Sequence, residues 1–374
     1  MKILIHGGGL QGLSCGFSLN KNHEVGIVAN DLHCLKSKFF KHVYSGFNLK
    51  DGSFMSILDN EHYDVLIPVS DICVPFVSKH KKMIEEKYDI KVAVPDYECV
   101  YQVEDKNRFM SFCERNGLPH PKTIALNDSN IDIASNIIGF PALIKPNYSV
   151  GARGITCVNN VSELIEKYPA IVETFGSCTL QEFIKNQEYY YNVMMYRDES
   201  GNILASAIIK IVRMYPVKTG SSSCCISVED PELLEICKRT LDALNWVGMA
   251  DFDVLQRLDN KEYKIIEINP RVPASLRGAA ISGINFPEII ARDVMGLPQM
   301  TYQYSSGKEM RYLGIDIMWL LKTKHLFGNT PSWFKFFGNN IYYQDIYKTD
   351  LSTWWTWLAE GLSKLRSRNK QLRK

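Results

Sequence analysis

The sequence of residues 249–277 constrains the fold most, because it predicts a β-hairpin with acidic side chains. Residues 253–255 and 264–268 form apolar runs that are typical of strands, and the polar residues 258–261 between them predict a turn. The two strands of a hairpin lie next to each other, so side chains from both strands share one face. The hairpin is therefore expected to gather residues from both strands into one site.

Three oxygen-bearing side chains and an arginine gather on this hairpin. Side chains two positions apart on a strand point the same way, so Glu267 and Asn269 share a face and Asp253 comes alongside Glu267. Mg²⁺ prefers a few oxygen ligands together with nucleotide phosphates, and the nearby Arg271 can bind phosphate through a bidentate fork. The pattern therefore predicts a metal and phosphate site. The alternative is an amphipathic hairpin whose acidic residues face water.

The composition is that of a globular protein with more than one hydrophobic core. With 374 residues, of which 45% are hydrophobic and 22% charged, two or three domains are expected. The net charge of +2 gives no overall field for nucleic acid or an anionic membrane, so no nucleic-acid partner is expected. The ten cysteines form no C-x-x-C pair, and we find neither a signal peptide nor an apolar run of about 18 residues. These features predict a reduced, cytoplasmic protein.

The first hundred residues predict strands that alternate with helices. A strand, the glycine turn Gly7–Gly12, an apolar helix and a second strand make one βαβ unit. The expected strands lie at residues 2–6, 23–29, 64–69 and 92–95, and the expected helices lie at residues 13–19 and 76–88. This alternation predicts an N-terminal doubly wound parallel sheet over residues 1–98.

Two features of this first part can bind a ligand or serve the fold. The turn Gly7–Gly12 satisfies G-x-G-x-x-G with Asp31 further on, which would suit a dinucleotide, but the same spacing occurs in many glycine turns without a cofactor. Ser70 and Asp71 follow a strand at the edge where such sheets bind ligands, and the alternative for Asp71 is to cap the next helix. An NAD-dependent oxidoreductase would leave the second half of the chain unexplained.

A lysine and a small-residue loop in the middle of the chain predict a phosphate site. Residues 140–146 form a buried strand that contains Lys145, and the loop Ser149–Ile155 follows it. Glycines let backbone N–H groups approach phosphate oxygens, and the lysine adds a positive charge for the same group. The alternative for Lys145 is a surface side chain whose ammonium group lies in water. The polar stretch Arg213–Ser223 is expected to be a second loop with many hydrogen-bond donors, or a flexible surface loop.

Taken in order, these segments resemble the ATP-grasp superfamily of ATP-dependent ligases over residues 1 to about 298. The ordered features are Lys106, Lys145, the loop at 149–155, the Gln-Glu-Phe-Ile segment at 181–184 and Glu-Ile-Asn-Pro-Arg at 267–271. The later segments are similar to the synthetase halves of the carbamoyl-phosphate synthase large subunit, through residues 218–221 and 266–272. They are also similar to carboxylate–amine ligases such as D-aspartate ligase.

The resemblance implies a role for each matching residue. It assigns phosphate contacts to Lys106 and Lys145, a lid to Ser149, Gly151 and Gly154, the adenine hinge to Glu182, Phe183 and Ile184, and the ribose to Glu188. It assigns two Mg²⁺ ions, with Mn²⁺ as a substitute, to Asp253, Glu267 and Asn269. It assigns the transferring phosphoryl group to Arg271, with Arg213 and Lys218 as secondary anion binders.

The implied activity is ATP-dependent ligation of a small carboxylate to a small amine. In-line phosphoryl transfer depends on positioning and charge neutralisation, which two metals, lysines and an arginine supply. An acyl phosphate hydrolyses readily, so a closing lid protects it from water. The alternatives are a non-catalytic ATP-binding sensor or scaffold, and a carbamoyl-phosphate synthase-like activity. The second is disfavoured because the chain has one grasp unit.

The expected fold is α/β: a doubly wound parallel sheet domain, a two-lobed α+β ATP-grasp unit and an aromatic-rich C-terminal extension. The boundaries are 1–98 for the first domain, 99–184 for the small lobe with its linker helix, 185–298 for the large lobe and 299–374 for the extension. A helix at residues 279–296 is expected to close the large lobe. Similar ligases are often dimers, so a homodimer is an expectation from the resemblance.

The C-terminal extension ends in an apolar helical stripe and a basic tail. Leu351, Trp354 and Trp355 begin the stripe, and beyond Glu360 the tail holds six lysines and arginines and no acid. An amphipathic basic helix can lie on an anionic membrane surface, which would make the protein membrane-peripheral. The favoured alternative is a helix docked on the enzyme body with a solvated tail.

Overall fold

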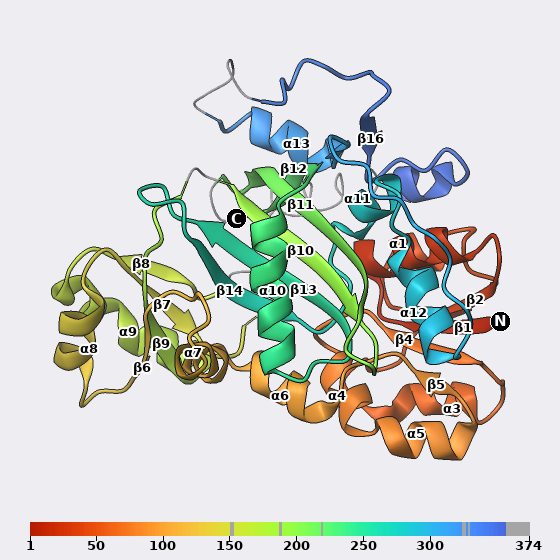
Figure 1. Ribbon diagram of the computed structural model, residues 1–374, viewed down its shortest axis with the longest axis horizontal. Coiled ribbons are helices and arrows are strands. Elements are labelled where there is room, and N and C mark those ends of the chain that lie inside the picture. The colour runs from red at the N-terminus through yellow and green to blue at the C-terminus, as the bar shows by residue number, and fades with distance from the viewer. Residues whose placement is uncertain (150–152, 187–188, 218–219, 324–326, 328–329, 357–374) are drawn as a thin grey trace, which may run out of the picture.

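The computed structural model shows an N-terminal domain, a central sheet and a small lobe that extends from one side of it (Figure 1). The residues that it describes are 1–149, 153–186, 189–217, 220–323, 327 and 330–356. Gly151, Glu188 and Lys218, which the sequence placed in the site, lie outside these described residues, as does most of the basic tail.

The N-terminal domain is a five-stranded parallel sheet, as predicted. Its strand order is β3-β2-β1-β4-β5. The strands are β1 (Lys2–His6), β2 (Glu24–Val28), β3 (His42–Tyr44), β4 (Val65–Pro68) and β5 (Lys91–Val92). The sequence analysis missed β3, because three residues with two polar side chains give no apolar run. Since β1 has parallel neighbours on both sides, the carboxyl ends of β1 and β4 meet at one edge of the sheet.

Helices cover both faces of this parallel sheet. On one face lies α1 (Gly9–Leu19), whose Leu13 and Cys15 are fully buried with Ile3 and Ile5. The other face carries η1 (Gly52–Phe54), α3 (Met55–Leu58), α4 (Val74–Lys79) and α5 (Lys81–Tyr88). The single helix expected at residues 76–88 is divided at His80, which ends α4 and precedes α5. The short helix α2 (Leu32–Leu35) follows β2.

Two helices lead from this domain into a small antiparallel lobe. They are α6 (Tyr97–Glu104) and α7 (Lys106–Arg115). The lobe has the strand order β6-β9-β7-β8, and every pairing is antiparallel. Its elements are β6 (Thr123–Leu126), α8 (Ile131–Ile138), β7 (Ala142–Pro146), β8 (Thr156–Val158), α9 (Val161–Phe175) and β9 (Cys178–Glu182). The helices α8 and α9 pack on this sheet through a small core of their own.

The central sheet has seven strands in the order β14-β13-β10-β11-β12-β15-β16. Its strands are β10 (Tyr190–Arg197), β11 (Ile203–Tyr215), β12 (Ser221–Val228), β13 (Gly248–Gln256), β14 (Tyr263–Asn269), β15 (Glu309–Arg311) and β16 (Ile341–Tyr343). The pairings are antiparallel except β15 with β16. The predicted hairpin is confirmed as β13 and β14, while the stretch expected as a loop from Arg213 to Ser223 largely extends β11 and β12.

The central sheet is covered on both faces. The helix α10 (Pro231–Ala243) packs on one face with Leu233, Cys237 and Leu241 in a buried core. On the other face, α11 (Leu276–Ile281) and α12 (Phe286–Val294) lie between the sheet and α1 of the N-terminal domain. The single helix expected at residues 279–296 is therefore two helices, with Gly283 at φ +99° in the turn between them. One continuous core thus joins the N-terminal domain to the central sheet.

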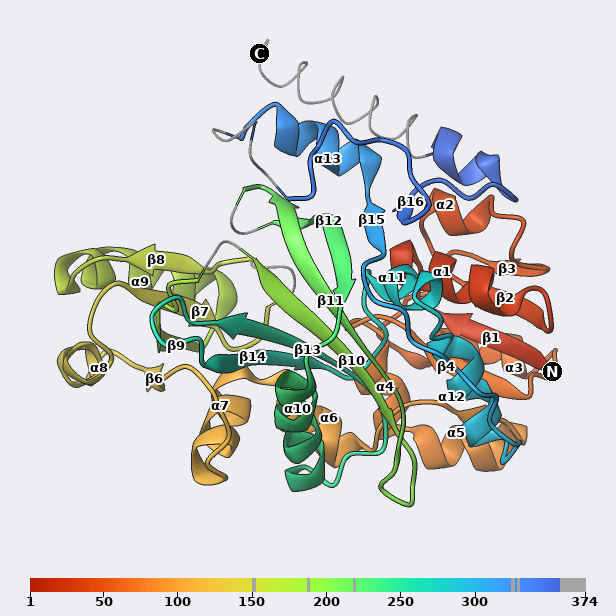
Figure 2. The ribbon, with the colours of Figure 1, turned by 45° about the horizontal axis from the view of Figure 1, so that its top comes forward.

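The C-terminal extension is built into the body of the protein. It adds β15 and β16 to the central sheet and places α13 (Leu313–Leu320) against β11 and β12 (Figure 2). The Arg277 guanidinium donates to the carbonyl oxygens of Tyr343, Gln344 and Ile346, and lies 3.8 Å from the ring centre of Tyr347. Among the described residues, no helix has the length and apolar character needed to cross a membrane.

Candidate active site

The hairpin β13–β14 brings the predicted carboxylates face to face. Asp253 is the direct cross-strand partner of Glu267, and Asp251 is the partner of Asn269. The same row continues into β10, where Asn192 pairs with Asp253 and its amide nitrogen donates to the Asp253 carboxylate. The Ser275 hydroxyl in turn donates to Asn192 Oδ1 over 3.0 Å. The two acidic residues are thus held on one sheet face by a chain of polar contacts.

Lys106 reaches this acidic pair from the start of α7. Asp105 caps the helix by accepting from the Arg108 N–H over 2.8 Å, which fixes Lys106 as the first helical residue. Lys106 Nζ lies 3.5 Å from Glu267 Oε1 and donates to the Ser149 carbonyl over 3.1 Å. The Lys106 side chain is buried, and the Glu267 carboxylate balances the charge of its ammonium group. It therefore links the small-lobe loop to the acidic face.

Lys145 is the second cation beside the carboxylates. It lies on β7 and is only 7% exposed, which rules out the surface alternative. Burial lowers the pKa of Lys145 to about 8, while the Glu267 carboxylate acts in the opposite direction. Among the described residues, no hydrogen bond or ion pair to Lys145 Nζ is found. A buried ammonium group with this environment is suited to a polyanion that enters the site.

Arg271 connects the acidic face to the N-terminal domain. Its Nε and Nη2 each donate over 2.7 Å to the two carboxylate oxygens of Asp71, which follows β4. Its Nη2 also donates to Asn269 Oδ1 over 3.2 Å. Burial disfavours the charge, but Asp71 outweighs burial and raises the pKa of Arg271 further above its usual range. Asp71 is therefore neither a helix cap nor a free side chain, since it fixes this arginine across two domains.

Burial changes the acidity of the carboxylates on this face. Desolvation, followed by repulsion from Glu267, raises the pKa of Asp253 to about 7. Desolvation and the neighbouring Asp253 raise the pKa of Asp251 well above its usual range. Closely spaced acids in a buried site favour a cation that relieves their repulsion. Perturbed acids of this kind cluster at functional sites.

Asp251 is a site residue that the sequence analysis missed. It is 1% exposed, accepts from Asn269 Nδ2 over 3.2 Å, and its Oδ1 has no hydrogen-bond partner in the described part of the chain. The signal was present, because residue 251 stands two positions before Asp253 and so faces the same way. Its contact with Asn269 orients an amide that the site uses.

The end of β9 supplies the segment expected to read adenine. Phe183 is 44% exposed, while Ile184 is buried. Glu182 lies 3.6 Å from Arg257, and the Leu258 N–H donates to the Lys185 carbonyl over 2.8 Å. These contacts hold the end of the small-lobe sheet against the turn of the β13–β14 hairpin. The segment therefore connects the two lobes, as a hinge requires.

The loop after β7 begins close to the two lysines. Ser149 accepts from Lys106 through its carbonyl, and its hydroxyl oxygen has no partner among the described residues. Gly154 has φ +77°, and a Cβ there would lie 2.7 Å from Pro146 and 2.8 Å from Phe175. This position therefore requires glycine for both conformation and space.

Arg213 lies elsewhere and has a different partner. It is 3% exposed, and its Nε and Nη2 donate to the two oxygens of Asp316 on α13, each over 2.8 Å. The cation is also 5.1 Å from the ring centre of Trp319. Its charge is thus matched inside the fold, on the helix that the C-terminal extension provides. The structure does not bring Arg213 to the acidic face, so we do not retain it as an anion binder.

The N-terminal glycine turn is occupied by a side chain of the protein itself. The Gly9 N–H donates to Asp31 Oδ2 over 2.9 Å, and the Cys34 N–H donates to Asp31 Oδ1 over 3.1 Å. A Cβ on Gly8 would lie 1.7 Å from the same carboxylate. The glycines therefore make room for Asp31. Its carboxylate accepts from the Gly9 N–H, a backbone donor that a bound phosphate would need. This arrangement argues against a dinucleotide site.

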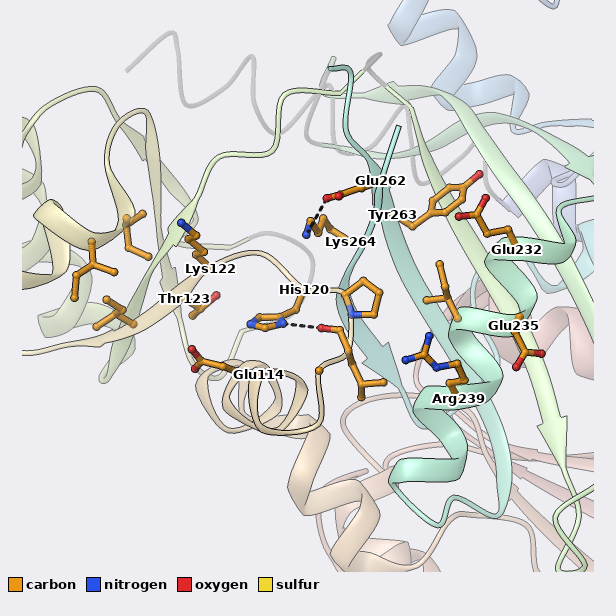
Figure 3. Close-up of a pocket in the computed structure, with 17 residues that line it drawn as sticks. Glu114, His120, Lys122, Thr123, Glu232, Glu235, Arg239, Glu262, Tyr263 and Lys264 are labelled. Atoms are coloured by element: carbon orange, nitrogen blue, oxygen red, sulfur yellow. Dashed lines mark hydrogen bonds and ion pairs between the residues drawn. The ribbon is translucent and has the colours of Figure 1, made fainter. Parts of the chain in front are cut away.

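A separate cavity of about 1060 Å³ lies between the small lobe and α10 (Figure 3). Lys122 and Thr123 line it from the small lobe, and Glu232, Glu235 and Arg239 line it from α10. Neither the two site lysines nor Asp253 and Glu267 line this cavity. It is therefore distinct from the candidate active site.

The donor set on the acidic face fits a hard divalent cation. It offers two carboxylates and one amide oxygen, which are the ligand types that Mg²⁺ takes together with phosphate oxygens. The described residues contain no group of three or more His, Cys, Asp or Glu side chains arranged for a metal ion. A metal at Asp253, Glu267 and Asn269 would therefore need a phosphate-bearing ligand to complete its coordination.

The family comparison agrees with this fold and site. Residues 103–275 match the ATP-grasp domain model, a range that includes Lys106, Lys145 and the β13–β14 hairpin. The chain therefore contains an ATP-grasp domain, which is the class of domain that its fold and site define. The resemblance found in the sequence is thereby confirmed.

The similar curated proteins are carbamoyl phosphate synthase large chains. The protein from Clostridium perfringens (strain 13) is 28% identical over 231 residues, which are 59% of this chain and 22% of that protein. The C-terminal section from Methanopyrus kandleri is 26% identical over 240 residues, which are 56% of this chain and 42% of that protein. This chain thus spans about a fifth of the full-length relatives and less than half of the separate section.

Solved structures with the same fold cover more of the chain. Biotin carboxylase from Campylobacter jejuni has a TM-score of 0.67 at 18% identity and covers 82% of this chain and 74% of its own. N5-carboxyaminoimidazole ribonucleotide synthetase from Thermotoga maritima has a TM-score of 0.60 at 20% identity and covers 81% of this chain and 78% of its own. At these identities the similarity shows the fold.

Proposed function

We propose that this protein is an ATP-dependent carboxylate–amine ligase that forms an amide through an acyl phosphate and releases ADP and phosphate. The observation that carries the proposal is the direct pairing of Asp253 with Glu267, with Lys106 3.5 Å from Glu267. Acids and lysines that lie together in a partly buried site suit Mg²⁺ and a triphosphate together. A site that bound only a neutral ligand would not need this balance of charges.

The phosphates of ATP would lie between the small lobe and the acidic face. Lys106 and Lys145 would contact them, because both lysines are buried and adjacent to Glu267. Ser149 and the loop that includes Gly151 and Gly154 would close over the triphosphate as a lid. The hinge at residues 182–184 would hold adenine, and Glu188 would bind the ribose. The roles of Gly151 and Glu188 rest on the sequence resemblance.

Two Mg²⁺ ions, or Mn²⁺ in their place, would be held by Asp253, Glu267 and Asn269. When bound, the metal neutralises charge on the phosphate oxygens. Asn192 and Asp251 would orient two of the ligands, since they contact Asp253 and Asn269. The raised pKa of Asp253, about 7, means that a cation would favour its ionised form near neutral pH.

The reaction needs positioning rather than a covalent protein nucleophile. A carboxylate oxygen of the substrate attacks the γ-phosphorus, the bond from the γ-phosphorus to the bridging oxygen breaks, and ADP leaves. The amine then attacks the acyl carbon, the bond to phosphate breaks, and an amide remains. Arg271 would orient the transferring group, and its bond to Asp71 fixes its guanidinium at the edge of the N-terminal domain. Lys218 is kept as a secondary anion binder from the resemblance alone.

Two other activities are tested alongside this one. The solved biotin carboxylase domain of a 2-oxoglutarate carboxylase contains bicarbonate beside MgADP, so bicarbonate is a second acceptor to test. A carbamoyl-phosphate synthase-like activity is the other alternative, because the chain is 28% identical to 22% of the large chain from Clostridium perfringens. A non-catalytic sensor would bind MgATP without turnover.

The deciding experiment measures ADP release with a panel of amino acids and small carboxylates, with hydroxylamine present to trap acyl phosphates. The proposal expects carboxylate-dependent ADP release and a hydroxamate product. Glu267→Gln is the inactive control, and Glu262→Gln, on the same strand region but in the separate cavity, is the matched active control. Tight MgATP binding without turnover for any pair would favour the sensor. Turnover with bicarbonate alone would favour a carboxylating enzyme.

A reducing compartment, the cytoplasm, is the proposed place of action. All ten cysteines are free, and most of them are buried. Ten free thiols, most of them buried, are typical of a protein in a reducing environment. The homodimer stays a prediction, and sedimentation analysis of the full chain would test it.

A further inference from the structure

The C-terminal extension exposes large apolar side chains along one side of the protein. We call this set the apolar face; its members are Leu321 (68% exposed), Phe327 (80%), Phe334 (51%), Phe337 (88%), Leu351 (55%) and Trp355 (61%). Phe327 and Phe334 stack with ring centres 5.8 Å apart, so part of this face is continuous. Exposed apolar patches of this kind mark interaction sites in soluble domains. The face is separate from the ATP-grasp site.

The exposed charges of the same segment all have one sign. Each aspartate and glutamate within residues 309–356 is buried and hydrogen-bonded, and these acids are Glu309, Asp316, Asp345 and Asp350. The described lysines of this segment, Lys322, Lys335 and Lys348, are exposed. The sequence that follows, residues 357–374, holds six lysines and arginines against the single Glu360. The described exposed charges of residues 309–356 are therefore all positive, although the whole chain is nearly neutral.

The elements that carry this surface lie on the same side of the molecule. Figure 2 shows α13 and the chain at residues 330–340 beside the central sheet, and the helix at residues 351–356 farther along the same side, next to α2 of the N-terminal domain. The Arg213–Asp316 pair and the Asp350 contacts with Ser37 and Lys38 fasten this segment to the body of the protein. The apolar face is thus presented by a fixed support.

We propose that this apolar face docks on an anionic lipid bilayer surface. Aromatic and leucine side chains enter the boundary between headgroups and acyl chains, while lysines approach anionic headgroups. The selective burial of every acid in the segment favours this occupant, because an exposed acid would be repelled by an anionic surface. The inference is independent of the proposed ligase activity. It adds a place of action, since the active site would work next to a membrane.

The experiment is co-sedimentation of the full-length protein with vesicles. One set contains phosphatidylcholine with phosphatidylglycerol, and the other contains phosphatidylcholine alone. The test variant carries Leu321→Ser, Phe334→Ser and Phe337→Ser, which are exposed positions whose replacement leaves the core intact. The matched control carries Ile133→Ser and Ile137→Ser on α8, which are 62% and 56% exposed and lie in the small lobe. A charge variant carries Lys322→Gln, Lys335→Gln and Lys348→Gln.

The proposal expects the wild type to bind anionic vesicles and to bind neutral vesicles much more weakly. The test variant should lose at least about tenfold in partitioning, and the charge variant about a hundredfold, while the α8 control binds like the wild type. No binding to anionic vesicles, or an equal loss in the α8 control, overturns the proposal. If the wild type is a dimer that the test variant dissociates and no vesicles bind, the face serves self-association instead. ADP release is not needed for any of these readouts.

Discussion

Replacing Asp71 by asparagine is expected to weaken both the fold and the active site. Asp71 holds Arg271 through two hydrogen bonds of 2.7 Å that join the N-terminal domain to the end of β14. The Arg271 side chain is 11% exposed and that of Asp71 is 28% exposed, so solvent screens the pair only in part. The Asp71→Asn variant keeps the shape of the side chain and removes its charge. A buried guanidinium then loses the anion to which it is hydrogen-bonded.

The magnitude follows from the burial of the pair. Removing one partner of a buried ion pair costs about 3–5 kcal/mol, and the partial exposure of Asp71 argues for the lower end, about 3 kcal/mol. The entropy of unfolding is about 2.1 cal/mol/K per residue, or about 0.8 kcal/mol/K if all 374 residues unfold together. The unfolding temperature should therefore fall by about 4 °C. Turnover should fall about a hundredfold, because Arg271 loses the contact that positions it.

Calorimetric unfolding and ADP release measure these two effects. The matched control is Asp259→Asn, because Asp259 also holds an arginine, Arg257, through two contacts of 3.1 and 3.2 Å, but its side chain is 66% exposed. That exposed pair should contribute little to stability, because water screens it. If Asp71→Asn and Asp259→Asn lower the unfolding temperature equally little, the Asp71–Arg271 contact does not join the domains energetically. Unchanged turnover would show that Asp71 does not position Arg271.

Three further predictions concern Glu267, Lys145 and Arg213. Glu267→Gln should abolish ADP release with little change in the unfolding temperature, and full turnover in this variant would refute the metal assignment. Burial lowers the pKa of Lys145 to about 8, so its positive charge is lost as pH rises from 7 to 9. The affinity for ATP, measured by calorimetry, should therefore fall over this pH range. Lys145→Arg should remove this pH dependence. The unfolded lysine holds its proton up to its ordinary pKa of 10.5, so the free energy of unfolding should rise between pH 8 and 10.5. For the same reason, Lys145→Met should stabilise the fold by about 3 kcal/mol at pH 7. A less stable Lys145→Met variant would contradict this. Replacing the buried Arg213–Asp316 pair by methionine and leucine should leave ADP affinity unchanged. Arg213→Met alone should lower the unfolding free energy by about 3–5 kcal/mol. A loss of ADP affinity in the double variant would restore Arg213 as an anion binder.

Local patterns in the sequence predicted the elements that hold the site. The hairpin was recognisable because two apolar runs flank a polar turn, and alternation places Asp253 and Glu267 on one face. The helix that positions Lys106 has Asp105 as its N-terminal cap, and an aspartate before a helix is also a local signal. The parallel sheet followed from strands that alternate with helices. These features depend on neighbours in the chain, and such neighbours are visible in a sequence.

Contacts between distant segments could not be predicted in this way. Asp71 and Arg271 are 200 positions apart, and Arg213 and Asp316 are 103 positions apart. No periodicity pairs such residues, so Asp71 was expected to bind a ligand or to cap the next helix, and the family resemblance made Arg213 an anion binder. The stretch from Arg213 to Ser223 was expected to be a loop because its serines are polar. Its two ends became strand, with residues 213–215 in β11 and residues 221–223 in β12, because β11 and β15 provide strand partners on both sides of β12.

The contacts of the last described residues set an order for making this protein. Ser14 of α1 is hydrogen-bonded to Tyr347, and the hydroxyl of Ser37 and the N–H of Lys38 both donate to Asp350 over 2.8 Å. The N-terminal domain can form its sheet while the chain is still being synthesised, but these polar groups receive their partners only after residues 347 and 350 have left the ribosome. The N-terminal domain is thus completed long after its own residues have been made. A nascent chain stopped before residue 347 would expose this seam to chaperones and proteases.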